Sequence, residues 1–544
     1  MIDTQELIHP GAPYTAPPRH GGIRGALGSL HPDDTGPRTG WSHRLRTLLA
    51  ILGPGLIVMV GDNDAGAFST YAEAGQNYGT TLLWTLALLI PVLYVNQEMV
   101  LRLGAVAGVG HARLILRRFG RFWGAFSVID LFVLNALTLV TEFIGISLGL
   151  KVLGVPRAWG LAGAAVLIMG AVSTGDFRRF ERFALALVAG SLLLVPVFLM
   201  VHPPLPVIAH DFFVPQMPVR APLADVMLLI IAIVGTTVAP WQLFFQQSYV
   251  IDKRIGARFI NYERIDLVIG IMLVILGAVA MIAFCAQAFG GTPQMGRFTD
   301  AGDVAWGLAR RYGSRLPGVL FAIGLIDASL IGAAAVSLSS VYAVADVFSL
   351  NHSLNDSPRQ AKLFYGIYFC LIVAAAALVL APHVPLGLLT NAVQTLAGVL
   401  LPSASVFLLL LCNDEAVLGP WVNSFRLNVV TLSIVAVLVT LSLVLTAAVL
   451  FPDLSSGRIE AILGVGAALG VLGVAALCLG RRSTAVRTRA ELQAARLAWR
   501  MPSLSSLGSI PLTPMRRAGM IVLRAYLLVA VAMVILRVIQ TAGK

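Results

Sequence analysis

The residues best suited to chemistry form a polar run, GDNDAG at residues 61–66, inside an apolar stretch. The thirteen residues Leu49–Gly61 lead into its first acid, and a helix of that length spans only about 20 Å. Because the hydrocarbon core of a membrane is about 30 Å thick, Asp62 and Asp64 are expected inside it. An ionised aspartate at that depth costs at least about 2.5 kcal/mol, so a functional role such as cation binding is expected.

A structural explanation competes with this one, because residues 62–64 could simply cap the helix that resumes after them. A cap needs one short polar side chain, and two acids at membrane depth exceed that need. The flanking glycines also permit a non-helical turn that frees backbone carbonyls. We therefore expect Asp62, Asn63, Asp64 and the carbonyl of Gly61 to contact a cation.

A second apolar segment is interrupted at a matching depth by Ala239-Pro240. Proline in a helix interior removes a hydrogen bond and clashes with the preceding turn. Unwound backbone inside a membrane is tolerated only where it is buried in protein or lines a cavity. We expect a break that frees a carbonyl near Thr236, although a simple kink at Pro240 is the alternative.

The rest of the chain consists of elements that can carry these residues across a membrane. Of its 544 residues, 57% are hydrophobic and 12% are charged, about half the charged fraction of a soluble domain. Apolar runs near 20 residues recur throughout, which indicates an all-α polytopic membrane protein. The thirteen expected helices span residues 47–74, 80–103, 122–150, 159–173, 182–202, 224–250, 264–290, 316–348, 361–381, 386–411, 427–451, 459–480 and 518–539.

The net charge of +12 could indicate nucleic-acid binding, but its distribution argues otherwise. Basic residues gather in loops between the apolar runs, most densely at residues 481–517, as the positive-inside rule requires. The N-terminus is therefore expected in the cytoplasm of a bacterial-type cell, with the chain in the inner membrane. The lipid bilayer is the expected partner, without nucleic acid or an obligate protein partner. Residues 302–313 are expected to form an amphipathic helix on the outer surface.

Interruptions in the first and sixth helices indicate two inverted five-helix repeats around a midplane site. The predicted domains are a disordered cytoplasmic tail at 1–45, a transport core at 46–411 with repeats 46–203 and 223–411, helices eleven and twelve at 425–481, a cytoplasmic basic linker at 482–517 and a thirteenth helix within 518–544.

The first helix resembles that of the NRAMP family of divalent metal transporters, and the resemblance covers roughly residues 45–450. The family has a LeuT-like fold with broken helices 1 and 6, and its first-helix motif is D-P-G-N. Asp64 matches the metal-binding aspartate of that motif, whereas Ala65 and Ala67 replace its proline and asparagine. The resemblance therefore implies that Asp64 binds a metal ion.

The sixth helix departs from the family in the metal site itself. The family carries A-x-x-M-P-H, and residues 236–241 read TTVAPW, with Ala239 at the metal-binding methionine and Trp241 at the histidine. Gln394, counted back from Pro402, aligns with a glutamine that lies near the metal in the family. This combination is similar to the NRAMP-related magnesium transporters.

The replaced methionine changes the expected ion. A thioether is a soft ligand that favours Mn2+, Fe2+ or Cd2+, whereas Mg2+ prefers oxygen ligands and keeps several waters. We expect the transported substrate to be Mg2+, largely hydrated, with Mn2+ also accepted, and no resident cofactor. The expected metal site comprises Asp64, Asp62, Asn63, Gly61, Thr236, Ala239 and Gln394. The expected pathway or cavity residues are Trp241, Ala67, Thr237, Pro240, Gln242, Gln246 and Glu142.

Two of these residues, Trp241 and Glu142, bear on water and protons. Trp241 could shape the cavity or donate its indole N–H to a metal-bound water, but it could equally be a packing residue. The family's proton route uses helix-6 histidines and an acid pair on helix 3, of which only Glu142 remains because Leu139 replaces its partner. Without groups that titrate near neutral pH, we expect uncoupled entry driven by the gradient and the membrane potential.

Other functions remain as alternatives. A proton-coupled Mn2+ or Fe2+ importer and a cation-coupled symporter of an organic solute share this fold, although two acids would repel a substrate carboxylate. An enzyme is not expected, since HExxH, GxSxG and P-loop lysine motifs are missing from the sequence.

Glu98 and Arg102 are expected to form a structural ion pair, because they lie four residues apart on one helix. Asp130 and Asp327, like Glu142, could line the pathway or bond to neighbours.

Overall fold

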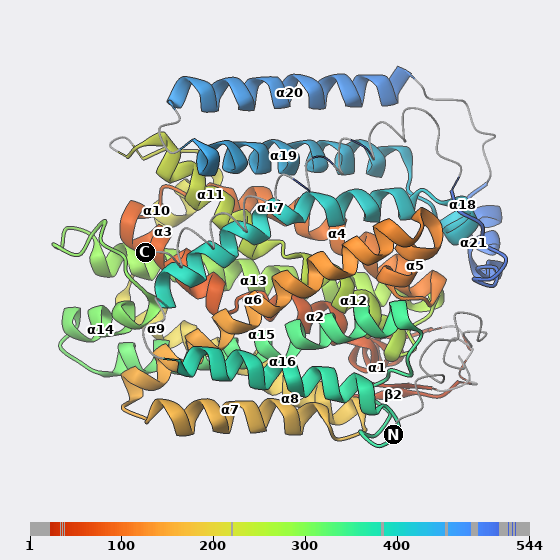
Figure 1. Ribbon diagram of the computed structural model, residues 1–544, viewed down its shortest axis with the longest axis horizontal. Helices are drawn as coiled ribbons and strands as arrows, with labels where there is room; N and C mark the ends of the chain where they lie inside the picture. The colour runs from red at the N-terminus through yellow and green to blue at the C-terminus, as the bar shows by residue number, and fades with distance from the viewer. Residues whose placement is uncertain are drawn as a thin grey trace.

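A computed structural model of the chain describes residues 22–32, 34, 36, 38–218, 221–381, 386–451, 455–479, 488–510, 521, 525 and 528. Apart from one short hairpin, its regular elements are helices that lie roughly along a common direction (Figure 1). In chain order the elements are β1 (Ile23–Arg24), β2 (Ser29–Leu30), α1 (Trp41–Ile51), α2 (Pro54–Val60), α3 (Ala65–Tyr78), α4 (Trp84–Ala107), α5 (His111–Phe119), α6 (Arg121–Leu153), α7 (Arg157–Val172), α8 (Phe177–Gly190), η1 (Ser191–Leu193), α9 (Leu194–Val201), α10 (Leu205–Phe213), α11 (Leu223–Thr237), α12 (Pro240–Asp252), η2 (Ala257–Phe259), α13 (Ile260–Phe289), α14 (Ala301–Arg311), α15 (Leu316–Phe348), α16 (Lys362–Leu380), α17 (Leu386–Cys412), α18 (Glu415–Leu418), η3 (Gly419–Trp421), α19 (Phe425–Leu450), α20 (Ser456–Leu479) and α21 (Arg489–Ala498).

The helices confirm a polytopic membrane protein. Among the described residues, nine helices are long and apolar enough to cross a membrane, and two bent helix pairs raise the number to eleven. The predicted fourth helix corresponds to α7, which is apolar but shorter, at 16 residues. The predicted thirteenth helix lies outside the described residues except at positions 521, 525 and 528.

The first span is interrupted where the polar run predicts it. Helix α2 ends at Val60, α3 begins at Ala65, and the four residues between them are turns and bends. A further break, which the apolar pattern did not predict, separates α1 from α2 by 52°. Gly53 causes it, because its φ of 152° favours glycine, and Pro54 then starts α2 at a position where proline needs no N–H.

The sixth span is also interrupted as predicted. Helix α11 ends at Thr237 and α12 begins at Pro240, with Val238 and Ala239 in non-helical conformations. Pro240 lacks an N–H, so it cannot donate to the carbonyl of Thr236 one helical turn earlier. The proline therefore accounts for the break.

The two interrupted spans cross with their breaks facing each other. Helix α2 contacts α12, and α3 contacts α11, so the first half of each span touches the second half of the other. Such pairing requires the spans to run in opposite directions, as inverted repeats do. The long helices α6 and α15, third in each predicted repeat, also pack against each other.

The N-terminal segment corrects a prediction. Disorder was expected through residue 45, but β1 and β2 form an antiparallel hairpin and α1 begins at Trp41. Ile23 and Leu30 are buried, and the backbone N–H of Ala26 donates to the buried carboxylate of Glu181 on α8. This anchoring orders residues 22–32, while residues 1–21 lie outside those that the structure describes.

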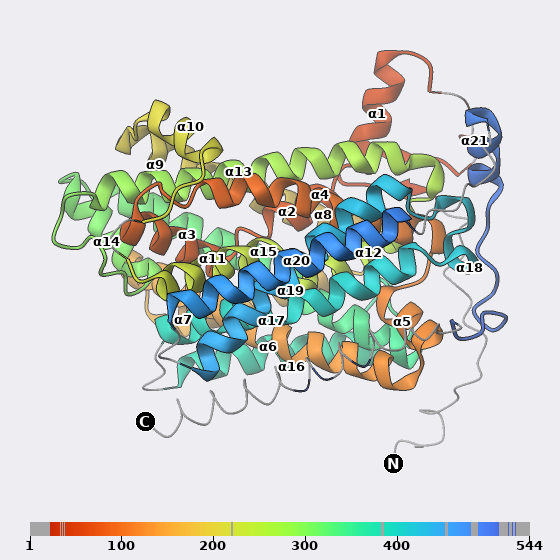
Figure 2. The same ribbon diagram turned by 90° about the horizontal axis from the view of Figure 1, so that it is seen from above.

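Each end of the bundle carries its own set of short helices. Helices α10 and α14 lie at one end, whereas α1, α5, α18 and α21 lie at the other (Figures 1 and 2). Helix α14 corresponds to the predicted amphipathic helix at 302–313. Helices α19 and α20 pack together, and α19 also packs on α17, so they form an outer layer of the bundle.

Candidate metal-binding site at two helix breaks

Asp64 lies at the centre of the candidate site. Its Oδ1 accepts a hydrogen bond from Ala67 N at 2.9 Å, which caps α3. Glu142 on α6 lies beside it, since both side chains approach the same point at Gly332 on α15. Two carboxyl groups in contact repel each other when both are ionised, so the pair favours a proton or a cation between them.

Three backbones must approach closely to create this contact. Glu142 Oε2 accepts from Ala65 N at 3.1 Å, so α6 is fixed against the start of α3. A Cβ at Gly332 on α15 would lie 2.8 Å from Glu142 Oε2 and 3.0 Å from the Cβ of Asp64. Only glycine leaves room for the two acids there.

Asp62 enters a chain of amides that reaches α4. Gln242 Nε2 on α12 donates to Asp62 Oδ1, and Gln242 Oε1 accepts from Gln97 Nε2 at 2.9 Å. All three side chains are buried. The Asp62 carboxylate orients the Gln242 amide, which in turn fixes one oxygen of the carboxylate. The other oxygen, Oδ2, has no hydrogen-bond partner among the described residues.

Asn63 points away from the two acids. Its Nδ2 donates to the carbonyl of Val274 on α13 at 3.1 Å. The structure therefore places the amide nitrogen of Asn63 beside α13, and the role of Asn63 as a metal ligand stays a prediction. Its position in the turn still follows from the predicted break.

The broken sixth span presents both backbone and side chains to the site. Ala239 is the first residue before α12, and Thr236 is buried in the last turn of α11. The Thr237 hydroxyl lies 2.6 Å from the hydroxyl of Tyr71 on α3, which joins the two broken spans. Helix C-termini such as those of α2 and α11 offer carbonyls that favour a cation.

Trp241 also belongs to this buried region. Trp241 is fully buried, and its ring would come within 3.8 Å of a Cβ at Gly61. Gln246 lies on α12 and is fully buried. Gln394 lies on α17, which packs against α3 and α11, but its side chain is outside the described residues.

Several buried polar atoms around the breaks lack a hydrogen-bond partner among the described residues. Buried polar groups usually have partners, so such a cluster requires water or an ion. The cluster fits a hydrated cation, since carboxylate, amide and hydroxyl oxygens can coordinate it or its waters. Its atoms are Asp62 Oδ2, Glu142 Oε1, Thr236 Oγ1, Gln97 Oε1, Trp241 Nε1 and both polar atoms of Gln246.

The donor set is poor in classical ligands. In the part of the chain that the structure describes, no three His, Cys, Asp or Glu side chains converge in a way that could hold a metal. Two acids with amide and backbone oxygens instead resemble the arrangement in which Mg2+ keeps several of its own waters.

Sequence reasoning missed Gln97 and Tyr71. The signal was available for Gln97, because Asn96-Gln97-Glu98 interrupts the apolar run that forms α4. Asn96 is fully buried, and neither polar atom of its side chain has a partner among the described residues. No spacing rule, however, links α4 to α12 or Tyr71 to the sixth span.

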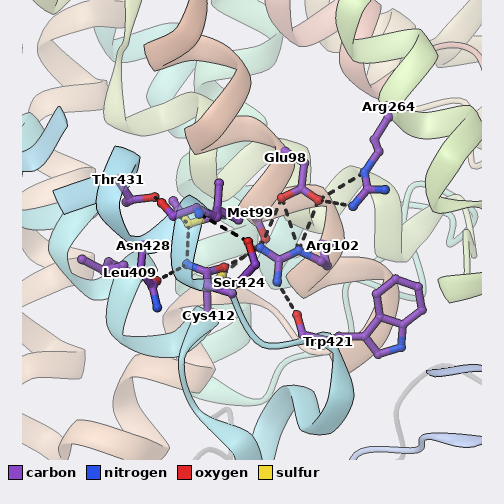
Figure 3. A network of polar contacts seen from close by, with 12 residues as sticks. Glu98, Met99, Arg102, Arg264, Leu409, Cys412, Trp421, Ser424, Asn428 and Thr431 are labelled. Atoms are coloured by element: carbon purple, nitrogen blue, oxygen red, sulfur yellow. Dashed lines mark hydrogen bonds and ion pairs between the residues drawn. The ribbon is translucent and has the colours of Figure 1, made fainter. Parts of the chain in front are cut away.

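Glu98 confirms its predicted structural pairing. Figure 3 shows it between two guanidinium groups, Arg102 at 3.2 Å and Arg264 at 2.6 Å. Arg102 also donates to the carbonyl of Trp421 and to Asn423, so the network connects α4 with α13 and the segment after α17. This network holds helix ends together and is separate from the site.

Known proteins share this architecture. A family model described as natural resistance-associated macrophage protein-like matches residues 55–448. The divalent metal cation transporter MntH of Ralstonia nicotianae is 28% identical over 409 residues, covering 72% of this chain and 89% of the relative. MntH of Burkholderia ambifaria is 26% identical over 448 residues, covering 79% and 93%.

Solved structures of a manganese transporter are also similar to this chain. A histidine-to-alanine mutant of the Eremococcus coleocola manganese transporter matches with a TM-score of 0.62 at 19% identity, covering 84% of this chain and 97% of that one. This likeness confirms the predicted LeuT-like fold with its broken first and sixth helices.

Proposed function

Since the chain belongs to the natural resistance-associated macrophage protein (NRAMP) family, we propose that it transports divalent metal ions across a membrane, with Mg2+ favoured and Mn2+ also accepted. The observation that carries this proposal is the pair of acids, Asp62 and Asp64, buried between two facing helix breaks. Relatives named as divalent metal cation transporters support the general activity. An enzymatic role has no comparable support.

The preference for Mg2+ rests on ligand chemistry. Ala239 presents only a methyl group at the start of α12, so that position offers no soft sulfur. The proposed ligands are the carboxylates of Asp64 and Asp62 with the carbonyls near Gly61 and Thr236, and Gln394 is proposed from α17. Trp241 Nε1 lacks a described partner and is proposed to donate to a metal-bound water.

We propose that entry is driven by the ion gradient and the membrane potential. Helix α12 presents glutamines, including Gln242 and Gln246, where a proton relay would need titratable groups. A proton-coupled route is the second candidate, because the contact between Asp64 and Glu142 could hold a proton that a metal ion displaces.

The proposed orientation has the N-terminus in the cytoplasm and the α5–α21 end of the bundle on the same side. Arginines gather there, including Arg113, Arg117 and Arg118 on α5 and Arg496 on α21. The positive-inside rule supports this orientation for a bacterial-type inner membrane.

Uptake into proteoliposomes tests the proposal. Mg2+, Mn2+ and Ca2+ entry would be followed with internal pH, for the wild type, Asp64→Ala and the control Glu460→Gln on exposed α20. Mg2+ entry without acidification, lost in Asp64→Ala alone, is expected. Acidification that accompanies Mn2+ entry would support the proton-coupled candidate, and normal Mg2+ uptake by Asp64→Ala would overturn the site.

A further inference from the structure

A cavity of about 430 Å³ lies beside the first helix break and outside the site described above. It is lined by residues of α2, α3, α8, η1, α9, α10, α13 and α15 and of the turn between α2 and α3. Its volume falls in the range of small-molecule sites, roughly 300–1,000 Å³. Its lining includes Val60 and Asn63 but neither Asp62 nor Asp64, nor any residue of α11 or α12.

Exposed apolar side chains surround the mouth of the cavity. Leu192, Val195 and Leu276 line it and are 56%, 50% and 59% exposed, on helices long enough to span the membrane. Leu205, at the start of α10, is 64% exposed and also lines the cavity. A molecule entering here must therefore dissolve in the bilayer first, so hydrated ions are excluded.

Three polar side chains line the cavity among these apolar residues, namely Asn63, Ser191 and Asp327, and the Ser191 hydroxyl already donates to the carbonyl of Val188. In the other two, the atoms that lack a partner among the described residues are oxygens. Asn63 is buried, and its Nδ2 is already committed to Val274, while its Oδ1 has no partner among the described residues. Asp327 on α15 likewise has a buried Oδ2 without a described partner. The cavity thus combines apolar walls with oxygen atoms that require a hydrogen-bond donor.

We propose that this cavity binds a lipid-soluble organic cation, with an alkyl tail among the leucines and a protonated primary amine on Asp327 and Asn63. A fatty acid carboxylate would be repelled by Asp327, and a hydrocarbon tail alone would leave both acceptors unpaired. Because Asn63 belongs to the turn between α2 and α3, the occupant would hold that turn fixed and inhibit transport without competing with the metal. This last effect rests on the proposed function, whereas binding does not.

Direct binding to the full chain in nanodiscs separates the two claims. Dodecylamine is the probe, and dodecanol and dodecanoate are analogues with the same chain length. We expect saturable binding of dodecylamine at one molecule per chain, and affinities for the two analogues that are lower by at least about tenfold. Equal binding of dodecanol would overturn the proposal in favour of a lipid groove.

Two variants locate the site, and a third serves as a matched control. Asp327→Asn should weaken dodecylamine binding at least about tenfold, and Ala280→Phe, which fills the lining at α13, should abolish it. Asp130→Asn removes an acid from α6 outside the cavity and should bind normally. Unchanged binding in both lining variants would overturn the proposal, and it would do so whether or not the protein transports metal ions.

Discussion

At the scale of single residues, Ala239 is proposed to set the choice of ion. A methionine at this position would place a thioether at the start of α12, the helix that packs against α2. Ala239→Met should therefore increase the preference for Cd2+ over Mg2+ by at least about tenfold. Competitive uptake of the two ions measures this ratio, and Ala239→Leu, of similar bulk without sulfur, controls for size. An equal shift in both variants would contradict the ligand argument.

Gln242 is expected to act through Asp62, because its amide donates to the carboxylate. Partners that orient a ligand typically contribute 10- to 100-fold to metal affinity, so Gln242→Leu should weaken Mn2+ binding by about that factor. Isothermal titration with Mn2+ gives the affinity directly. If Gln242→Leu bound Mn2+ as tightly as the wild type, the orienting role of Gln242 would be contradicted.

The sequence predicts some of these residues better than others. The acids at 62 and 64 and the break at Pro240 follow from local pattern, because charge and proline are costly inside a membrane helix. The Gln242–Gln97 bond and the turn of Asn63 toward α13 depend on contacts between distant helices. No spacing within one helix encodes such contacts.

At the scale of elements, the break between α1 and α2 depends on Gly53. Its φ of 152° disfavours any side chain, and a Cβ would lie 2.2 Å from Glu181 Oε1. Gly53→Ala should destabilise the protein by at least about 1–3 kcal/mol, whereas Gly163→Ala, on α7 with open space around it, should not. Thermal unfolding in detergent compares them, and equal midpoints would refute the strained-turn explanation.

Lys253 stabilises the end of α1 at this break. Its Nζ donates to Ile51 O at 2.6 Å and Leu52 O at 2.9 Å, and it forms a buried ion pair with Glu181 at 2.6 Å. Lys253→Met leaves the carboxylate buried and unpaired, which should cost about 3–5 kcal/mol. Adding Glu181→Gln should recover part of that loss, and a double-mutant cycle on unfolding would detect the coupling. Additive losses would contradict a direct ion pair.

The loop after α15 should respond to pH. Burial lowers the pKa of His352, but its hydrogen bond to Asp346 and the charge of that residue more than offset this, so the pKa is raised above 6.5. The protonated pair stabilises the fold fully below the unfolded value near 6.5, and this contribution is lost as pH rises through the raised pKa. As pH rises through this range, the thermal unfolding midpoint of the wild type should fall. The midpoint of His352→Gln should fall less.

The predicted and observed elements differ where local pattern is weak. The break at Gly53 was missed because apolar residues continue on both sides of it. The hairpin at residues 23–30 was missed because strands of two residues have no periodicity. Both are fixed by tertiary contacts with Glu181 and Lys253.

At the scale of the whole molecule, the segment after α20 returns to the bundle. Thr488 and Glu491 form a capping box that starts α21, within the stretch predicted as a cytoplasmic basic linker. Trp421 Nε1 donates to the carbonyl of Arg496, whose guanidinium lies 5.0 Å from the Trp421 ring. The segment that contains α21, which we call the extension, therefore covers the same end of the bundle as α5 and α18 (Figure 2).

Arg118 provides a second anchor for this segment. It pairs with Asp414 at 2.5 Å and donates to the carbonyl of Gly508. Arg118→Met should loosen the part of this segment around Gly508, because it removes both contacts and leaves the charge of Asp414 buried and unpaired. Limited proteolysis should then cut this segment faster than in the wild type or in the exposed control Arg500→Met. Equal cleavage rates would show that Arg118 does not hold the extension.

The central claim is that a divalent cation binds at the turn between α2 and α3, opposite the break before α12. Anomalous scattering from a Mn2+ complex tests it most directly. The account predicts a peak in contact with the Asp64 carboxylate, within about 2.3 Å and absent from Asp64→Ala crystals. A Mn2+ peak elsewhere in the bundle that persists in Asp64→Ala would contradict it.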